Sequence, residues 1–201
     1  MQHALEDTLA DVRMDEDGEM RIIGIEGTVS LRINLYEEEE LNLLEDLYSL
    51  EQKVSYQTRE AVYEELLLQN QSKCKIVENL SLPELKDDVL QICHSSGSVQ
   101  IEHVETRAEK QGGILIEGIL HVSFLYLKAD DALPFGNWQG MVPFSYLLEC
   151  PDMPKDVRYQ LSNRVEQISV TMTGSDSVEV KAVLDFDVFL RKEVPMQVIT
   201  E

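Results

Sequence analysis

The chain has 201 residues and a formal net charge of −21 at pH 7, because 38 Asp and Glu outnumber 17 Lys and Arg. Such a surface repels phosphate groups, which argues against nucleic acids and anionic membranes as partners and favours basic proteins. No apolar run approaches the ~20 residues of a spanning helix, and the N-terminus lacks the features of a signal peptide. We expect a cytoplasmic protein without membrane insertion.

The acidic residues are concentrated in the first quarter of the chain. Residues 1–50 hold fourteen Asp and Glu against three Arg, and the densest run is Glu37, Glu38, Glu39 and Glu40. Four consecutive side chains diverge on any regular backbone, so a calcium site is not expected there. The run is either a solvated acidic surface or a docking patch for a basic partner.

The first predicted elements form a hairpin. Residues 15–18 read Asp-Glu-Asp-Gly, a typical turn in which Gly18 can adopt a positive φ. We expect a strand at residues 20–36 to pair across this turn with residues 11–14. The alternation of apolar and polar residues in 20–36 indicates a half-buried strand.

The period changes over residues 58–72, where the sequence predicts one amphipathic helix. Ala61, Val62, Leu66 and Gln69 are three to four residues apart, and Glu60, Glu64 and Glu65 lie near the start. Thr58 is a suitable N-cap, and acidic residues suit the N-terminal end of the helix dipole. We expect this helix to pack on a sheet.

Short predicted strands fill the remainder of the chain. Alternating segments occur at residues 99–106, 113–126, 138–144, 159–172 and 180–190, and turns are expected at 95–98, 111–113 and 174–176. Pro143 restricts the strand at 138–144 to an edge or an end. Many short strands joined by Gly and Asp turns predict antiparallel sheets in a sandwich or barrel.

One strand pattern occurs three times, at residues 25–36, 116–126 and 180–190. The first and third copies match over the longest stretch, with Leu31 against Phe186 and Leu35 against Leu190. Residues 12–50 therefore resemble residues 167–201, which predicts a chain built from repeated β units. Chance alignment of hydrophobic strands is the alternative.

Residues 113–126 followed by 140–149 resemble the SPOCS domain of spore-coat morphogenesis proteins of endospore-forming Firmicutes. The pattern is a strand with a Glu-Gly step (Glu117, Gly118) that ends at Tyr126, then an acidic turn, then a strand with a Pro-Phe step (Pro143, Phe144). The resemblance implies a mainly β interaction module on the mother-cell side of the forespore, with a spore-coat morphogenetic protein as partner.

The resemblance also implies an order of domains. Residues 1–52 would be the C-terminal part of a preceding SPOCS-like unit, residues 53–78 a connector that contains the helix, and residues 79–201 a complete unit. An unpaired strand at the N-terminus or a sheet edge would allow self-association.

The densest aromatic cluster consists of Trp138, Phe135, Phe144 and Tyr146. The candidate partner-binding residues are taken from this region and from the acidic run: Trp138, Pro143, Phe144, Tyr146, Glu37, Glu38, Glu39 and Glu40. As core residues the aromatic side chains need no functional explanation, whereas on an exposed edge they would be a binding hot spot. If Trp138 and nearby tyrosines were exposed on one face, the alternative function would be a carbohydrate- or small-ligand-binding β-sandwich.

Signals for catalysis and for cofactors are weak. Cys74, Cys93 and Cys150 are odd in number and far apart, which is typical of reduced thiols in the cytosol. His103, Glu105 and His121 could converge on a metal or serve a hydrolase if their strands pair, but such residues are more often plain surface. We therefore expect a non-enzymatic module without a cofactor or metal, which acts by protein interaction in spore coat assembly.

Overall fold

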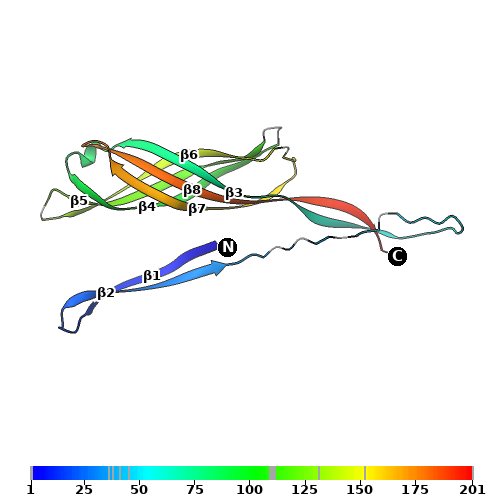
Figure 1. Ribbon diagram of the computed structural model, residues 1–201, viewed down its shortest axis with the longest axis horizontal. Coiled ribbons are helices and arrows are strands. Elements are labelled where there is room, and N and C mark those ends of the chain that lie inside the picture. The colour runs from blue at the N-terminus through cyan, green and yellow to red at the C-terminus, as the bar shows by residue number, and fades with distance from the viewer. Residues whose placement is uncertain are drawn as a thin grey trace. The chain divides into compact units, whose positions relative to one another are not determined.

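The computed structural model describes residues 2–35, 37, 39–40, 42–44, 46–108, 112–130, 132–151 and 153–200, with side chains from residue 5 onward. The chain divides into two compact units at residues 44 and 45. Both are built from antiparallel strands (Figure 1), which confirms the mainly β prediction. Among the described residues, no helix has the length and apolar character needed to cross a membrane.

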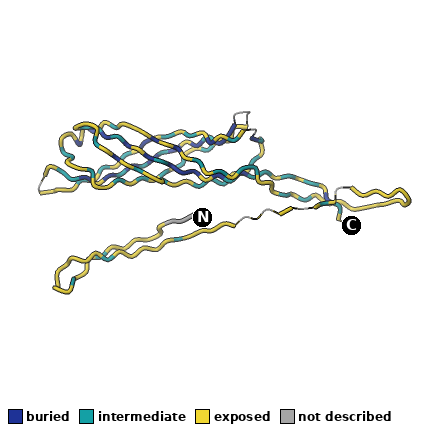
Figure 2. The backbone as a smooth tube through the Cα atoms, viewed as in Figure 1, coloured by how far each residue is buried: buried dark blue, intermediate teal, exposed yellow. Residues whose placement is uncertain are grey.

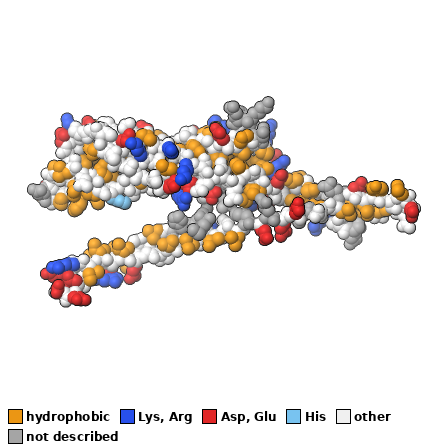
Figure 3. Space-filling view, viewed as in Figure 1, with side chains coloured by type: hydrophobic (Ala, Val, Ile, Leu, Met, Phe, Trp, Pro, Cys, Tyr) orange, Lys and Arg blue, Asp and Glu red, His pale blue; other side chains and the backbone are white. Residues whose placement is uncertain are grey.

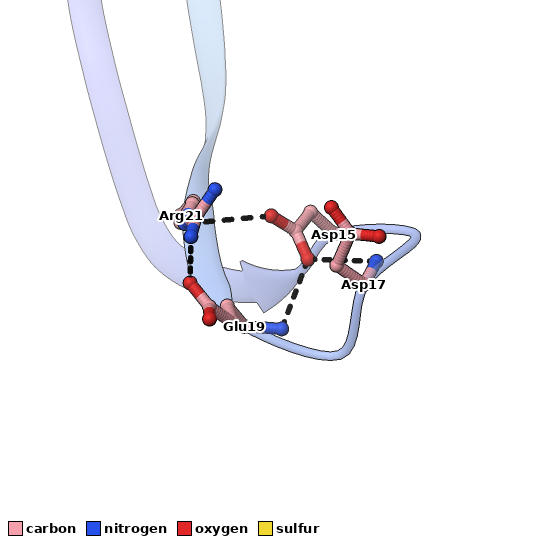
Figure 4. Close-up of polar contacts among 4 residues, drawn as sticks. All are labelled: Asp15, Asp17, Glu19 and Arg21. Atoms are coloured by element: carbon pink, nitrogen blue, oxygen red, sulfur yellow. Dashed lines mark hydrogen bonds and ion pairs between the residues drawn. The ribbon is translucent and has the colours of Figure 1, made fainter.

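The first unit is a hairpin of β1 (Gln2–Met14) and β2 (Met20–Arg32). The predicted turn at residues 15–18 is confirmed, and Gly18 has a φ of 79°. Asp15 organises this turn, because its Oδ1 accepts the backbone N–H groups of Asp17 at 3.0 Å and Glu19 at 2.9 Å. Figure 4 shows Arg21 closing the cluster, with Nε 3.7 Å from Oδ2 of Asp15.

The second unit contains two three-stranded sheets. One has the order β3 (Thr58–Ser81), β8 (Ser177–Ile199) and β7 (Arg158–Met172). The other has the order β4 (Val89–Arg107), β5 (Gly113–Lys128) and β6 (Phe135–Glu149). A single 3-10 turn, η1 (Pro83–Leu85), lies between β3 and β4. The central strands, β8 and β5, each pair with a neighbour on both sides.

The core of this unit lies between the two sheets, which form a sandwich. Alternate residues of β5 and β8 are fully buried (Figure 2), as a period of two requires for strands with one face covered. The largest side chains with almost no exposed surface in these strands are Ile114, Ile116, Leu120, Phe124, Leu184, Phe186 and Leu190. Burial of each such side chain contributes roughly 1.5–3 kcal/mol.

The helix predicted at residues 58–72 is wrong, because β3 covers this segment and pairs with β8 along its whole length. A β-bulge between Leu66 and Leu68 explains the misleading period. Before the bulge, odd-numbered residues such as Tyr63 are partly buried, and after it even-numbered residues such as Cys74 and Ile76 are buried. An extra residue in a strand shifts the inward side by one position, so the apolar spacing resembled that of a helix.

The turn predicted at residues 95–98 is also wrong. These residues continue β4, and Ser96 and Gly97 pair with Ser123 and Val122 of β5. A Cβ atom on Gly97 would lie 2.7 Å from Cδ1 of Ile168 in β7. The glycine therefore makes room for a side chain of the opposite sheet and does not mark a chain reversal.

Candidate protein-docking surface

Strand β6 forms an edge of its sheet, as the position of Pro143 predicted. From Phe135 to Leu148 this strand has no charged residue, although 27% of the whole chain is charged. Its odd-numbered side chains point away from the core, and Met141 is 64% exposed. Soluble proteins commonly protect exposed edges with charges, so this uncharged edge is unusual for so acidic a chain.

The backbone of β6 offers hydrogen-bonding groups along this edge. In an antiparallel strand, residues that bond to the neighbouring strand alternate with residues whose N–H and C=O point away from it. Pro143 pairs in register with Ile119 and has no N–H. A proline is tolerated in an edge strand where its nitrogen faces away from the neighbouring strand, because no hydrogen bond to β5 is lost there. Pro143 therefore interrupts the row of free donors, and donors remain on either side of it.

The inner face of β6 holds the three aromatic residues that the sequence singled out. The Trp138 ring stacks on Phe124 with centroids 5.1 Å apart, and its Nε1 donates to Oε1 of Glu84 at 3.1 Å. Tyr146 stacks on Phe186 at 5.6 Å, and its hydroxyl hydrogen-bonds to that of Ser72 in β3. These rings are half-buried and bind the edge strand to the core.

Phe144 reaches the core over a glycine. It pairs in register with Gly118 of β5, and its ring lies 6.2 Å from that of Phe186 in the opposite sheet. A Cβ atom on Gly118 would lie 3.1 Å from Cζ of Phe144 and 2.4 Å from the carbonyl oxygen of Gln100. Of the four candidate binding residues on β6, only Pro143 is exposed, and Phe135, the remaining aromatic residue of the cluster, is 61% exposed.

The acidic residues at 37–40 belong to the segment that follows β2. Glu37, Glu39 and Glu40 are exposed and outside regular secondary structure, while Glu38 lies outside the described residues. Carboxylates in this setting attract basic groups at a range of about 8–10 Å in physiological salt. They belong to the first unit, whereas β6 belongs to the second.

The histidine cluster considered from the sequence does not form. β4 and β5 do pair, but His103 lies opposite Glu117 while His121 lies opposite Ser98. His121 Nε2 is 3.1 Å from Oε1 of Gln100, and Glu105 accepts from Arg107 at 3.1 Å. Within the described ranges, no group of three or more His, Cys, Asp and Glu side chains is arranged to hold a metal ion.

Comparison with known families gives a match over residues 88–173 to the SPOCS domain of SipL. This part of the chain, residues 88–173, is a SPOCS domain. The domain begins one residue before β4 and ends one residue after β7, so the match contains the whole β4–β5–β6 sheet. This is a sporulation-related domain. No curated protein and no solved structure matches the chain.

The second unit contains a buried ionic contact that sequence reasoning missed. Asp185 on β8 is 3% exposed, and its Oδ2 accepts from Nε of Arg164 at 2.8 Å and Nε2 of Gln71 at 2.7 Å. Arg164 and Lys73 are the register partners of Asp185 on the two flanking strands. Only the register reveals this arrangement, since the three residues are far apart in sequence.

Proposed function

We propose that this protein is a non-enzymatic interaction module of spore coat or envelope assembly, which docks a protein partner along β6. The observation that carries the proposal is an uncharged edge strand in a chain with a net charge of −21. An extended segment of a partner can add to such an edge through main-chain hydrogen bonds, and side-chain contacts then give specificity. By family resemblance, the partner is a spore-coat morphogenetic protein in the mother-cell cytoplasm.

The inward side chains of β6 stabilise the fold, and we assign binding to its outward side chains. Trp138, Phe144 and Tyr146 hold β6 against the core and keep its edge rigid. Because the strand is already ordered, binding a partner there would cost less conformational entropy. Met141 and Pro143 on the outer face are exposed and would contact the partner. The acidic segment at 37–40 favours a partner with basic residues and would raise the association rate.

The carbohydrate-binding alternative needs Trp138 on an exposed face. Its ring instead lies against Phe124 and over Gly140, where an added Cβ atom would lie 2.0 Å from Cη2 of the indole. A sugar would have to displace this packing before it could stack on the indole. Protein docking requires no such rearrangement, and we favour it for this reason.

The proposal is tested by affinity capture from sporulating cells with the full chain as bait. We expect recovery of a coat or forespore-surface protein, followed by direct binding measurements with that protein. Met141→Lys places a charge on the outer face of β6 and should weaken binding by about tenfold, equivalent to about 1.4 kcal/mol. Thr171→Lys is the matched control, because Thr171 is exposed on β7 in the other sheet.

Two results would count against this function. One is the absence of any coat or forespore-surface protein among the captured partners. The other is equal binding by the wild type, Met141→Lys and Thr171→Lys, which would remove β6 from the interface.

A further inference from the structure

The two faces of the β1–β2 hairpin differ sharply in polarity. Between Arg21 near the turn and His3 opposite Leu31, the register places a set of uncharged residues on one face: Leu5, Thr8, Ala10, Val12, Ile23, Ile25, Gly27, Val29 and Leu31. The large apolar members of this set are exposed, and Ile25 reaches 71%. We call this set the hairpin face. Figure 3 shows hydrophobic side chains along the hairpin, and Figure 2 shows that the strands are mostly exposed.

The hairpin face of β2 corresponds to the buried face of β8. At the repeat spacing found in the sequence, the matched pairs are Ile23 with Val178, Ile25 with Val180, Gly27 with Ala182, Val29 with Leu184 and Leu31 with Phe186. Each of these β8 residues is buried against the core, and Val180 is 0% exposed. The same side chains therefore serve as core in one unit and lie uncovered in the other.

A β-bulge provides an independent structural sign of this equivalence. In β1 a register shift lies between Leu5 and Asp7, opposite Val29 and Thr28. In β7 a register shift lies between Val165 and Gln167, opposite Leu184 and Val183. The repeat spacing aligns Val29 with Leu184 and Thr28 with Val183, so the two bulges lie at equivalent positions. A bulge changes which side chains face inward, so its recurrence at one place marks a shared architecture.

We infer that β1–β2 is the counterpart of the β7–β8 hairpin and docks onto a SPOCS sheet of the β4–β5–β6 kind that lacks its own closing hairpin. The sandwich itself shows what covers such a face, namely the inward side chains of β5, such as Ile116, Leu120 and Phe124. Two sheets packed in this way exclude water from both apolar faces. An uncharged apolar face also suits a sheet better than it suits a basic peptide.

Docking would in addition provide β2 with a strand partner on its free side. In the sandwich, β8 pairs with β7 on one side and with β3 on the other. β2 pairs with β1 on one side, which leaves its other edge for a strand equivalent to β3. The occupant therefore consists of strands corresponding to β3, β4, β5 and β6.

The test uses the full chain and, as probe, a fragment of residues 46–151 that contains β3 to β6. A synthetic peptide of residues 156–200, which contains β7 and β8, is the positive control. Its binding would show that the fragment can accept a closing hairpin. We expect the full chain to form a one-to-one complex with the fragment, measured by analytical ultracentrifugation. Ile25→Lys should weaken this complex at least tenfold, whereas Thr28→Lys on the opposite face should leave it unchanged.

Three results would overturn the inference. The fragment could bind the control peptide and not the full chain. Ile25→Lys and Thr28→Lys could have equal affinity. The full chain could instead form a dimer that Ile25→Lys abolishes and the fragment does not displace, which would assign the hairpin face to a second copy. None of these results bears on β6, so the docking function proposed above would be unaffected.

Discussion

Gly118 of β5 lies directly opposite Phe144 of β6, and the Phe144 ring passes over the glycine to reach Phe186 in the other sheet. The Glu-Gly and Pro-Phe steps, more than twenty residues apart in sequence, are thus two sides of one cross-strand contact. Aromatic residues commonly cover glycines in sheets in this way. The two sequence steps by which the chain resembles the SPOCS family therefore meet in this one packing contact between Gly118 and Phe144.

Gly118→Ala should destabilise the sandwich. The new Cβ atom would lie 2.4 Å from the carbonyl oxygen of Gln100, which belongs to the backbone and cannot move without disturbing β4. Overpacking of this kind costs about 1–3 kcal/mol, measured as the free energy of unfolding in urea. Gly27→Ala is a matched control in the same Glu-Gly step of β2, where the nearest atom would lie at 3.4 Å. An equal loss of stability in both variants would contradict this explanation.

Trp138→Ala should lower stability because the indole packs on Phe124 and bonds to Glu84. Truncation of a large aromatic side chain at a buried site costs about 3–5 kcal/mol, and a half-buried ring should give a smaller loss. Trp138→Phe should retain most of the stacking. Trp138 is the single tryptophan of the chain, so its emission reports on this site directly. An unchanged melting temperature in Trp138→Ala would show that the ring contributes little to the fold.

Arg164→Met should be more damaging than the loss of an ordinary surface cation. Asp185 is buried, and removal of Arg164 would leave this carboxylate with Gln71 as its remaining observed donor. Breaking a buried pair costs about 3–5 kcal/mol, an upper bound here because Arg164 itself is largely exposed. Arg158 lies in β7 like Arg164, and it forms an exposed ion pair with Glu193 of β8. Arg158→Met should therefore cost less than about 1 kcal/mol. Similar unfolding free energies for the two variants would contradict this ranking.

The strands of this fold could be predicted from the sequence where one face of the strand is buried and the period stays regular. β5 and β8 alternate for most of their length, and their turns follow from Gly and Asp. β3 could not be predicted because the bulge at Leu66 and Leu68 breaks the alternation, and because its hydrogen-bond partner lies more than a hundred residues away. Local spacing cannot distinguish a bulged strand from a helix when the stabilising contact is so distant.

The candidate docking surface could be predicted in part. The lack of charge in β6 and the edge position of Pro143 are visible in the sequence. The inward direction of Trp138, Phe144 and Tyr146 depends on which side of β6 meets the core. Apolar residues occur on both sides of this strand, so its pattern alone left the side open. The contact between Asp185 and Arg164 depends on register and could not be predicted from spacing.

Alkaline pH should weaken the sandwich through two of its thiols, those of the buried Cys74 and the partly buried Cys150. Burial raises the pKa of the Cys74 thiol and that of the Cys150 thiol. The folded chain therefore keeps protons that the unfolded chain releases, so this contribution is complete below the unfolded pKa and is lost as pH rises toward the folded pKa. We expect the free energy of unfolding to decline with pH in the range where free thiols titrate.

Alkylation with iodoacetamide at mildly alkaline pH gives a second measure of the same effect. Cys93 is exposed and should react first, while Cys74, which is buried and has a raised pKa, should react only as the chain unfolds. Cys74→Ala should flatten the alkaline decline in stability because it removes one of the two titrating groups, although it also leaves a small cavity. The slope against pH separates these two effects, since a cavity lowers stability equally at all pH values. An unchanged slope in Cys74→Ala would show that burial of this thiol does not govern the alkaline response.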